Sequence, residues 1–97
     1  MRPKLGGHVS KSGGLMKAIE NAQAIGAECF QIHATSPRMW KVNLPKEEES
    51  HQFKEYITTH DIPVYIHAPY LINLATPDAA LLAKSKENLK GNLIIAD

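Results

Sequence analysis

The sequence contains a single cysteine, Cys29, in 97 residues. One thiol excludes an internal disulfide and any zinc site built from several cysteines. The longest uninterrupted apolar stretches, residues 79–83 and 93–96, are far shorter than the ~20 residues that a membrane helix needs. The first ten residues also lack the apolar core of a secretory signal. We therefore expect a cytoplasmic protein without a membrane partner, in which any metal is held by histidines and carboxylates.

Net charge is small as well, because 11 Lys and Arg are balanced by 10 Asp and Glu. The overall charge therefore does not indicate a nucleic-acid-binding protein. The charges are unevenly placed, since residues 1–46 carry seven basic and two acidic side chains, whereas residues 47–97 carry four basic and eight acidic ones. A basic first half would suit a polyanionic partner, and it is equally typical of unevenly charged helix surfaces.

Alternation of apolar and polar residues predicts three short strands, at residues 5–9, 27–34 and 63–67. Turn-forming or chain-breaking residues bound each of them. In the first strand, Leu5 and Val9 are expected to face the helices. In the third strand, Val64 and Ile66 are expected to do so.

Apolar residues at helical spacing predict a helix after each strand. The first has Ser12 as its N-cap and ends at Gly26. The second begins at Pro45, carries acidic residues in its first turn and ends at residues 60–61. The third begins at Pro77. The apolar stripe expected for the second helix is Phe53, Tyr56 and Ile57, and the buried stripe expected for the third is Leu81, Leu82, Leu89, Leu93 and Ile94.

Strands that alternate with helices predict an α/β fold with a parallel sheet, joined by right-handed crossovers and covered by helices. Three βα units make an open sheet with two unpaired edges and one uncovered face. We therefore expect the chain to associate with itself through these edges.

Each predicted strand carries a histidine at or near its C-terminal end, on the face opposite its helices. Since Val64 and Ile66 face the helices, His67 points the other way, and the same alternation applies to His33 and His8. That rim of a parallel α/β sheet is where ligands bind. Neutral imidazole is a common metal ligand, so the three rings would converge on one ion, or each would be an ordinary hydrogen-bonded interior histidine.

The loops after the second and third strands carry a second group of candidate residues. Arg38 and Trp40 follow the second strand, while Tyr70, Leu71 and Asn73 follow the third. An arginine beside aromatic and aliphatic side chains suits a minor-groove wedge or a base-stacking surface. Ordinary packing of Trp40 over its loop accounts for the same pattern.

Three segments of the sequence resemble the opening of the endonuclease IV family. They are Gly-His-Val-Ser at residues 7–10 with Gly-Gly-Leu at 13–15, Ser-Pro-Arg-Met-Trp at 36–40, and His-Ala-Pro-Tyr-Leu-Ile-Asn-Leu at 67–74. The resemblance covers essentially the whole sequence, although Ser36 stands where many relatives have Asn. It implies a (βα)8 TIM barrel, which needs ~250 residues. Residues 1–97 would then be the N-terminal part of a single truncated barrel domain, with three of its eight βα units.

The resemblance also implies a function, that of a zinc-dependent apurinic/apyrimidinic endonuclease. Such enzymes hydrolyse the phosphodiester 5′ to an abasic site in DNA during base-excision repair. Among the ligands of the family's three-zinc cluster, the matching position is His67. Arg38 matches the arginine that enters the DNA at the lesion, and Tyr70 and Leu71 match the pair that probes the minor groove.

The resemblance assigns no catalytic residue within the 97 residues, and it places the other zinc ligands outside them. Whether this chain is itself an enzyme therefore stays open, and we expect it to be inactive alone. His8 matches a histidine of the family's opening motif without being a ligand, and His33 is not part of the motif.

Two other functions are compatible with the same pattern. One is a fragment of a xylose-isomerase-like sugar-phosphate isomerase or epimerase, whose barrel also places metal ligands at strand ends. The other is a non-catalytic oligomerising module. The segments at residues 36–40 and 70–74 favour the nuclease, because a small sugar needs no protruding wedge.

Overall fold

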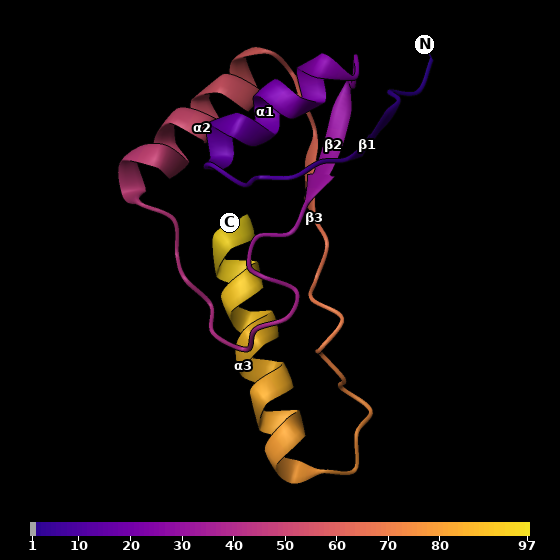
Figure 1. Cartoon of the computed structure of the whole chain (residues 1–97), viewed down its shortest axis with the longest axis vertical. Helices are drawn as coiled ribbons and strands as arrows, with labels where there is room; N and C mark the ends of the chain where they lie inside the picture. The colour runs from indigo at the N-terminus through magenta and orange to yellow at the C-terminus, as the bar shows by residue number, and fades with distance from the viewer. Residues whose placement is uncertain (1) are drawn as a thin grey trace. The chain divides into compact units, whose positions relative to one another are not determined.

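The computed structural model describes residues 2–97, which form three strands and three helices in alternation (Figure 1). In chain order these are β1 (Gly6–His8), α1 (Leu15–Ala24), β2 (Cys29–Ile32), α2 (Glu47–Thr59), β3 (Val64–Ile66) and α3 (Ala79–Ala96). The strands make one sheet in the order β1-β2-β3. β1 pairs in parallel with β2, with Gly6 opposite Cys29 and His8 opposite Gln31. The predicted element order and the parallel α/β architecture are confirmed.

The internal contacts of the chain divide it into two compact units. Unit 1 comprises residues 2–32 and 45–65, which include β1, β2, α1 and α2. Unit 2 comprises His33–Leu44 and Ile66–Asp97, which are the loops after β2 and β3 together with α3. Apart from His8, every candidate site residue named above belongs to unit 2.

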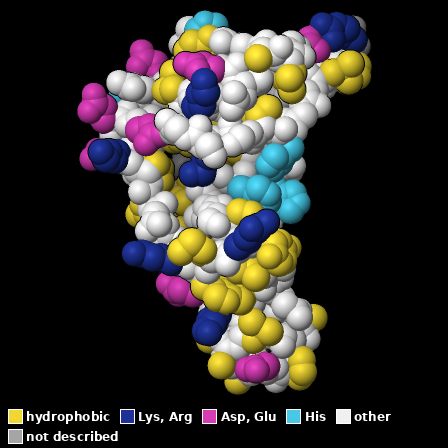
Figure 2. All heavy atoms as spheres, viewed as in Figure 1, with side chains coloured by type: hydrophobic (Ala, Val, Ile, Leu, Met, Phe, Trp, Pro, Cys, Tyr) yellow, Lys and Arg dark blue, Asp and Glu magenta, His cyan; other side chains and the backbone are white. Residues whose placement is uncertain are grey.

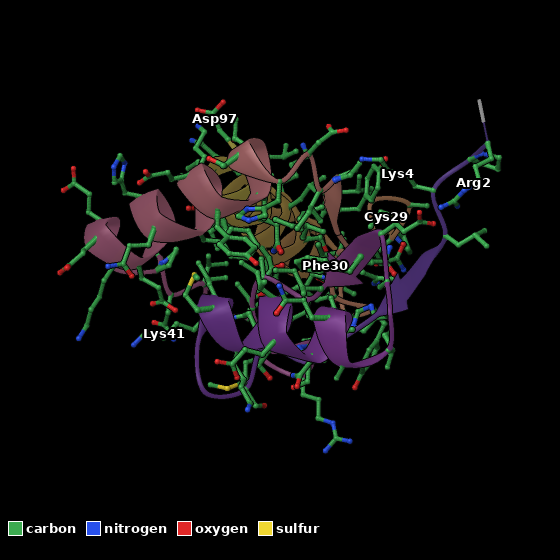
Figure 3. The ribbon with its side chains drawn as sticks, turned by 90° about the horizontal axis from the view of Figure 1, so that it is seen from above. Arg2, Lys4, Cys29, Phe30, Lys41 and Asp97 are labelled. Carbon is green, nitrogen blue, oxygen red and sulfur yellow. The ribbon has the colours of Figure 1, made fainter. Side chains whose placement is uncertain are left out.

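The core of unit 1 forms where β2 meets α1 and α2, the helices that precede and follow it along the chain. Phe30 and Ile32 are 2% and 3% exposed, whereas Cys29 and Gln31 on the other face are half-buried. Phe30 projects from β2 (Figure 3) and meets Phe53 of α2 edge to face, with ring centroids 6.2 Å apart. This alternation is the one predicted from the sequence. The residues that α1 buries are Leu15, Ala18, Ile19 and Ala22.

The start of α1 differs from the prediction. Ser12 is not its N-cap, because the helix begins at Leu15 and Gly14 occupies the cap position with φ 121°. The backbone N–H of Leu15 donates instead to the Glu49 carboxylate of α2, over 2.6 Å. A carboxylate from a neighbouring helix thus satisfies one of the donors that a helix start leaves open. At the other end, Gly26 lies in the left-handed region with φ 69°, as predicted.

The second helix and the third strand agree with their sequence patterns. α2 has acidic residues throughout its first turn and ends against His60 as its C-cap. Its predicted apolar stripe, which includes Phe53 and Tyr56, is half-buried. In β3 the flanking residues are half-buried and Tyr65 between them is 61% exposed, which is the predicted alternation.

The first strand is shorter than predicted, and its two apolar residues differ in exposure. Val9 is buried as expected, whereas Leu5 is 69% exposed. The expectation for Leu5 is wrong: its side chain is exposed, although its carbonyl still accepts from the backbone N–H of Glu28, over 2.8 Å.

The N-terminal segment of unit 1, in which Figure 3 labels Arg2 and Lys4, forms two ion pairs. The Arg2 guanidinium donates two hydrogen bonds to the Glu28 carboxylate, which also accepts from the backbone N–H of Leu5. These hydrogen bonds, with that from Arg2 the larger cause, lower the pKa of Glu28 to about 2. Lys4 forms a second ion pair, over 2.9 Å, with the carboxylate of Asp61 in the turn before β3. The segment before β1 is therefore attached both to the residue before β2 and to the turn before β3.

In unit 2, α3 begins close to its predicted start but buries a different face. Asp78 is the N-cap, and its side chain accepts from the backbone N–H groups of Ala80 and Leu81. The predicted apolar stripe is wrong in its C-terminal half, because Leu93 is 63% exposed and Ile94 is 56% exposed. Figure 2 shows exposed hydrophobic side chains on the surface in yellow.

The buried face of α3 is polar. Ser85, Asn88 and Asn92 are at most 4% exposed, and each makes a hydrogen bond. A buried polar group is tolerated when it is hydrogen-bonded. Backbone groups of the neighbouring loops are the partners of Ser85 and Asn88, whereas Nδ2 of Asn92 donates to the carbonyl and side-chain oxygens of Asn88.

Within the described chain, none of the helices combines the length and the apolar character needed to cross a membrane.

The cap that α2 provides to α1 can be tested by comparing two neighbouring glutamates. Glu49→Ala should lower the free energy of unfolding by about 1 kcal/mol more than Glu48→Ala, because a lost cap typically costs that much. Both changes remove one acidic residue from the first turn of α2, so the helix-dipole effect is matched. Urea unfolding of the two variants measures the difference. Equal destabilisation would show that the bond to Leu15 contributes nothing.

Candidate functional site

Two histidines of unit 2 lie together at the ends of two strands. His33 directly follows β2 and His67 directly follows β3. Their ring centroids are 4.9 Å apart and their planes are inclined by 66°. His33 is half-buried and His67 is exposed. Strand alternation therefore brings two of the three predicted histidines to one place.

Hydrogen bonds to backbone carbonyls orient both rings. Nδ1 of His33 lies 3.2 Å from the carbonyl oxygen of His67, and Nδ1 of His67 lies 2.6 Å from that of Ala68. A carbonyl oxygen only accepts, so Nδ1 carries the proton in each neutral ring and Nε2 carries the lone pair. Metal-ligating histidines in proteins are commonly fixed in this way, with the second ring nitrogen donating to a carbonyl or carboxylate.

The third predicted histidine belongs to unit 1. Nδ1 of His8 lies 3.2 Å from the side-chain oxygen of Gln31, its partner in the parallel register. Over residues 2–97, no three or more His, Cys, Asp and Glu side chains are grouped so as to hold a metal ion. Of the two interpretations left open by the sequence, the one in which all three histidines bind one ion is therefore not supported within these residues. His33 and His67 of unit 2 offer two nitrogen ligands. They fit part of a zinc site, because a structural zinc site needs four ligands and a catalytic one needs three from the protein.

The loop after β2 presents Arg38 from a fixed turn. The carbonyl of Ser36 accepts from the backbone N–H of Met39, over 3.3 Å. Further along the same loop, the carbonyl of Trp40 accepts from Nδ2 of Asn88 on α3, over 2.9 Å. Arg38 and Met39 are both exposed at the turn. A guanidinium on an anchored turn suits contact with an external anion.

The loop after β3 presents Tyr70 in a similar manner. Pro69 is buried, Tyr70 is 70% exposed and Leu71 is half-buried. The backbone N–H of Asn73 donates to the hydroxyl of Ser85 on α3, over 3.0 Å. The loop is thus attached to the helix on one side while its aromatic ring faces outward, an arrangement that suits stacking or insertion.

One stripe of α3 therefore holds both loops. Ser85 and Asn88 are three residues apart, which places them on the same face of the helix, and both are fully buried at 0% and 1% exposure. Sequence reasoning missed these two residues. The helical spacing of Ser85, Asn88 and Asn92 was the signal that could have identified the buried face of α3. Hydrophobicity instead favours the leucines of the same helix as its buried residues.

Comparison with protein families and individual relatives gives a consistent result. The family model described as "Xylose isomerase-like TIM barrel" matches residues 19–97. "Probable endonuclease 4" of Halothermothrix orenii is 41% identical over 88 residues, which cover 90% of this chain and 32% of that protein. "Probable endonuclease 4" of Aquifex aeolicus is 42% identical over 80 residues, covering 82% of this chain and 28% of that protein.

A solved structure is similar over nearly the whole chain. The crystal structure of endonuclease IV from Thermus thermophilus matches with a TM-score of 0.88 and 35% sequence identity. The match covers 97% of this chain and 36% of that one. The predicted likeness to part of a TIM barrel is confirmed, and the chain spans about a third of the length of the relatives it matches.

The contact between α3 and the Arg38 loop can be tested at Gly91. A Cβ atom built there would lie 2.8 Å from both methyl carbons of Val42 and 2.9 Å from its Cβ. Gly→Ala inside a helix normally stabilises by about 1 kcal/mol, whereas overpacking costs about 1–3 kcal/mol. We therefore expect Gly91→Ala to be neutral or destabilising in the natural chain, and to stabilise by about 1 kcal/mol in a Val42→Gly background, which removes all three of these atoms. A double-mutant cycle by urea unfolding measures this coupling, and identical effects in both backgrounds would contradict it.

Proposed function

Because the chain belongs to the xylose isomerase-like TIM-barrel family, we propose that its 97 residues are the N-terminal part of an endonuclease IV-type enzyme. The enzyme would hydrolyse the phosphodiester 5′ to abasic sites in DNA. The observation that carries this proposal is that the two loops resembling the family's DNA-contacting segments, with Arg38 and Tyr70, are both tied to α3. The names and the 41% and 42% identities of the relatives support the same function.

Arg38, Tyr70 and Leu71 would make the contacts with DNA. Arg38 would supply a permanent positive charge to the phosphates at the lesion, where its planar guanidinium donates to two oxygens at once. Tyr70, with half-buried Leu71 beside it, would insert at the minor-groove side and partly unstack the neighbouring base step. An abasic site lowers the cost of this insertion, because one base of the stack is already missing.

His67 would hold one zinc ion. Zinc, when bound, supplies Lewis-acid polarisation of the phosphodiester and lowers the pKa of its bound water. The hydrogen bond from Nδ1 of His67 to the carbonyl of Ala68 would fix the tautomer in which Nε2 carries the lone pair. We propose that residues 1–97 form three of the eight βα units of one barrel domain, and that further units of the kind found in the longer relatives supply the remaining ligands.

The sugar-phosphate isomerase alternative agrees with the family model, whose description names xylose isomerase. The names of the relatives and the exposed ring of Tyr70 favour the nuclease over it. Self-association through the sheet edges and a cytoplasmic location stay predictions.

The first test concerns catalysis by the 97 residues themselves. Since three or more metal ligands are not gathered within residues 2–97, the purified chain should not incise an abasic duplex in the presence of zinc. A gel assay with a labelled duplex measures this. Incision that disappears on addition of a chelator would show that the chain suffices for the activity.

The second test concerns DNA binding by the two loops. Arg38→Ala and Tyr70→Ala should each weaken binding to an abasic duplex about tenfold or more at low salt. For Tyr70 the reason is that one stacked or inserted ring contributes about 1–3 kcal/mol, and for Arg38 that a hydrogen bond to a charged group contributes about 1.5–3 kcal/mol. Lys41→Ala is the matched control, since it removes an exposed cation from the same loop. Fluorescence anisotropy measures the Kd for abasic and intact duplexes. If Arg38→Ala and Lys41→Ala weakened binding to both duplexes equally, Arg38 would contribute only a non-specific electrostatic attraction to DNA.

A further inference from the structure

We propose that His33 is a second imidazole donor to the cation assigned above to His67, so that unit 2 alone carries a two-histidine site for a zinc-like divalent ion. The inference rests on the proposed function for the presence of a metal at His67. It goes beyond it because the resemblance gives no role to His33. The evidence is the placement of the two rings and the hydrogen bonds that orient them.

The distance between the rings suits a shared ion. Two imidazoles on one tetrahedral zinc, with Zn–N bonds of about 2.0–2.1 Å, have ring centres roughly 5 Å apart. The His33 and His67 centroids are 4.9 Å apart. The ring planes are inclined by 66°, in an edge-to-face arrangement, so the two rings are not stacked.

The protonation of the rings suits the same role. Both Nδ1 atoms face carbonyl oxygens, 3.2 Å away for His33 and 2.6 Å away for His67. Each Nδ1 therefore holds its proton, and Nε2 is the nitrogen with a lone pair in both rings. Two neighbouring imidazoles in the same tautomer offer two donors of the type that zinc and other late divalent metals prefer.

The bond from His33 also links the two ligands. It ends on the carbonyl of His67 itself, so the orientation of the first ring depends on the backbone that carries the second. Such a link reduces the freedom that two exposed or half-exposed side chains would lose on binding one ion.

The experiment titrates the 97-residue chain with Zn²⁺ by isothermal calorimetry and compares three variants. His33→Phe and His67→Phe keep an aromatic ring in place and remove its nitrogens. His51→Ala is the control, because His51 is an exposed histidine of α2 whose Nε2 lies 3.8 Å from Glu55. We expect one zinc per chain, a loss of at least about tenfold in affinity for each Phe variant, and no change for His51→Ala. Circular dichroism of the variants verifies that they remain folded.

A second measurement does not depend on the variants. In the natural chain labelled with ¹⁵N, zinc should shift the Nε2 resonances of His33 and His67 together, and leave those of His51 unchanged. If His67 responds alone and His33→Phe keeps full affinity, His33 is not a donor, whereas the metal role of His67 in the proposed function stands. If neither ring responds, the two-histidine site is refuted, and the abasic-duplex binding of the Arg38 and Tyr70 variants then decides separately on the nuclease.

Discussion

The two-residue period of β2 determines what lies on each side of the sheet. Phe30 and Ile32 are nearly fully buried on the helix side, and burial of two such side chains is worth several kcal/mol. Gln31 and His33 must then face the opposite side. A shift of the strand by one residue would expose the phenylalanine and bury the polar residues, so it is strongly disfavoured. The position of His33 beside His67 is in this sense a consequence of core packing in unit 1.

Much of the fold could be predicted because its signals are local. The alternation in β2 and β3 needs only neighbouring residues, and the left-handed Gly26 and the acidic first turn of α2 mark helix ends by their own conformational and electrostatic preferences. Strand alternation also carried the prediction that His33 and His67 share a rim. A parallel α/β arrangement then followed from the order of the elements.

Other features could not be predicted because their partners are distant in the sequence. The backbone N–H of Leu15 at the start of α1 donates to Glu49, which lies 34 residues further along the chain. Local sequence preferences therefore indicate Ser12 as the N-cap, although it does not cap the helix. Likewise, hydropathy alone assigns the leucines of α3 to the interior. Its inner face is polar because a carbonyl of the Arg38 loop, 48 residues away, accepts from Asn88, and hydropathy does not register such a partner.

The buried side-chain amides of α3 restrict the rotation of that helix about its own axis. Hydrophobic contacts tolerate small rotations, since an apolar surface has no direction, whereas a hydrogen bond weakens steeply as its angle departs from linear. One residue of rotation would turn Asn88 outward and bring Glu87 or Leu89 to its position. The Trp40 carbonyl would then lose its donor, because neither of these side chains carries an amide N–H. The buried amides of α3 therefore favour a single rotation of the helix about its axis, and this fixes the positions of the loops that carry Arg38 and Tyr70.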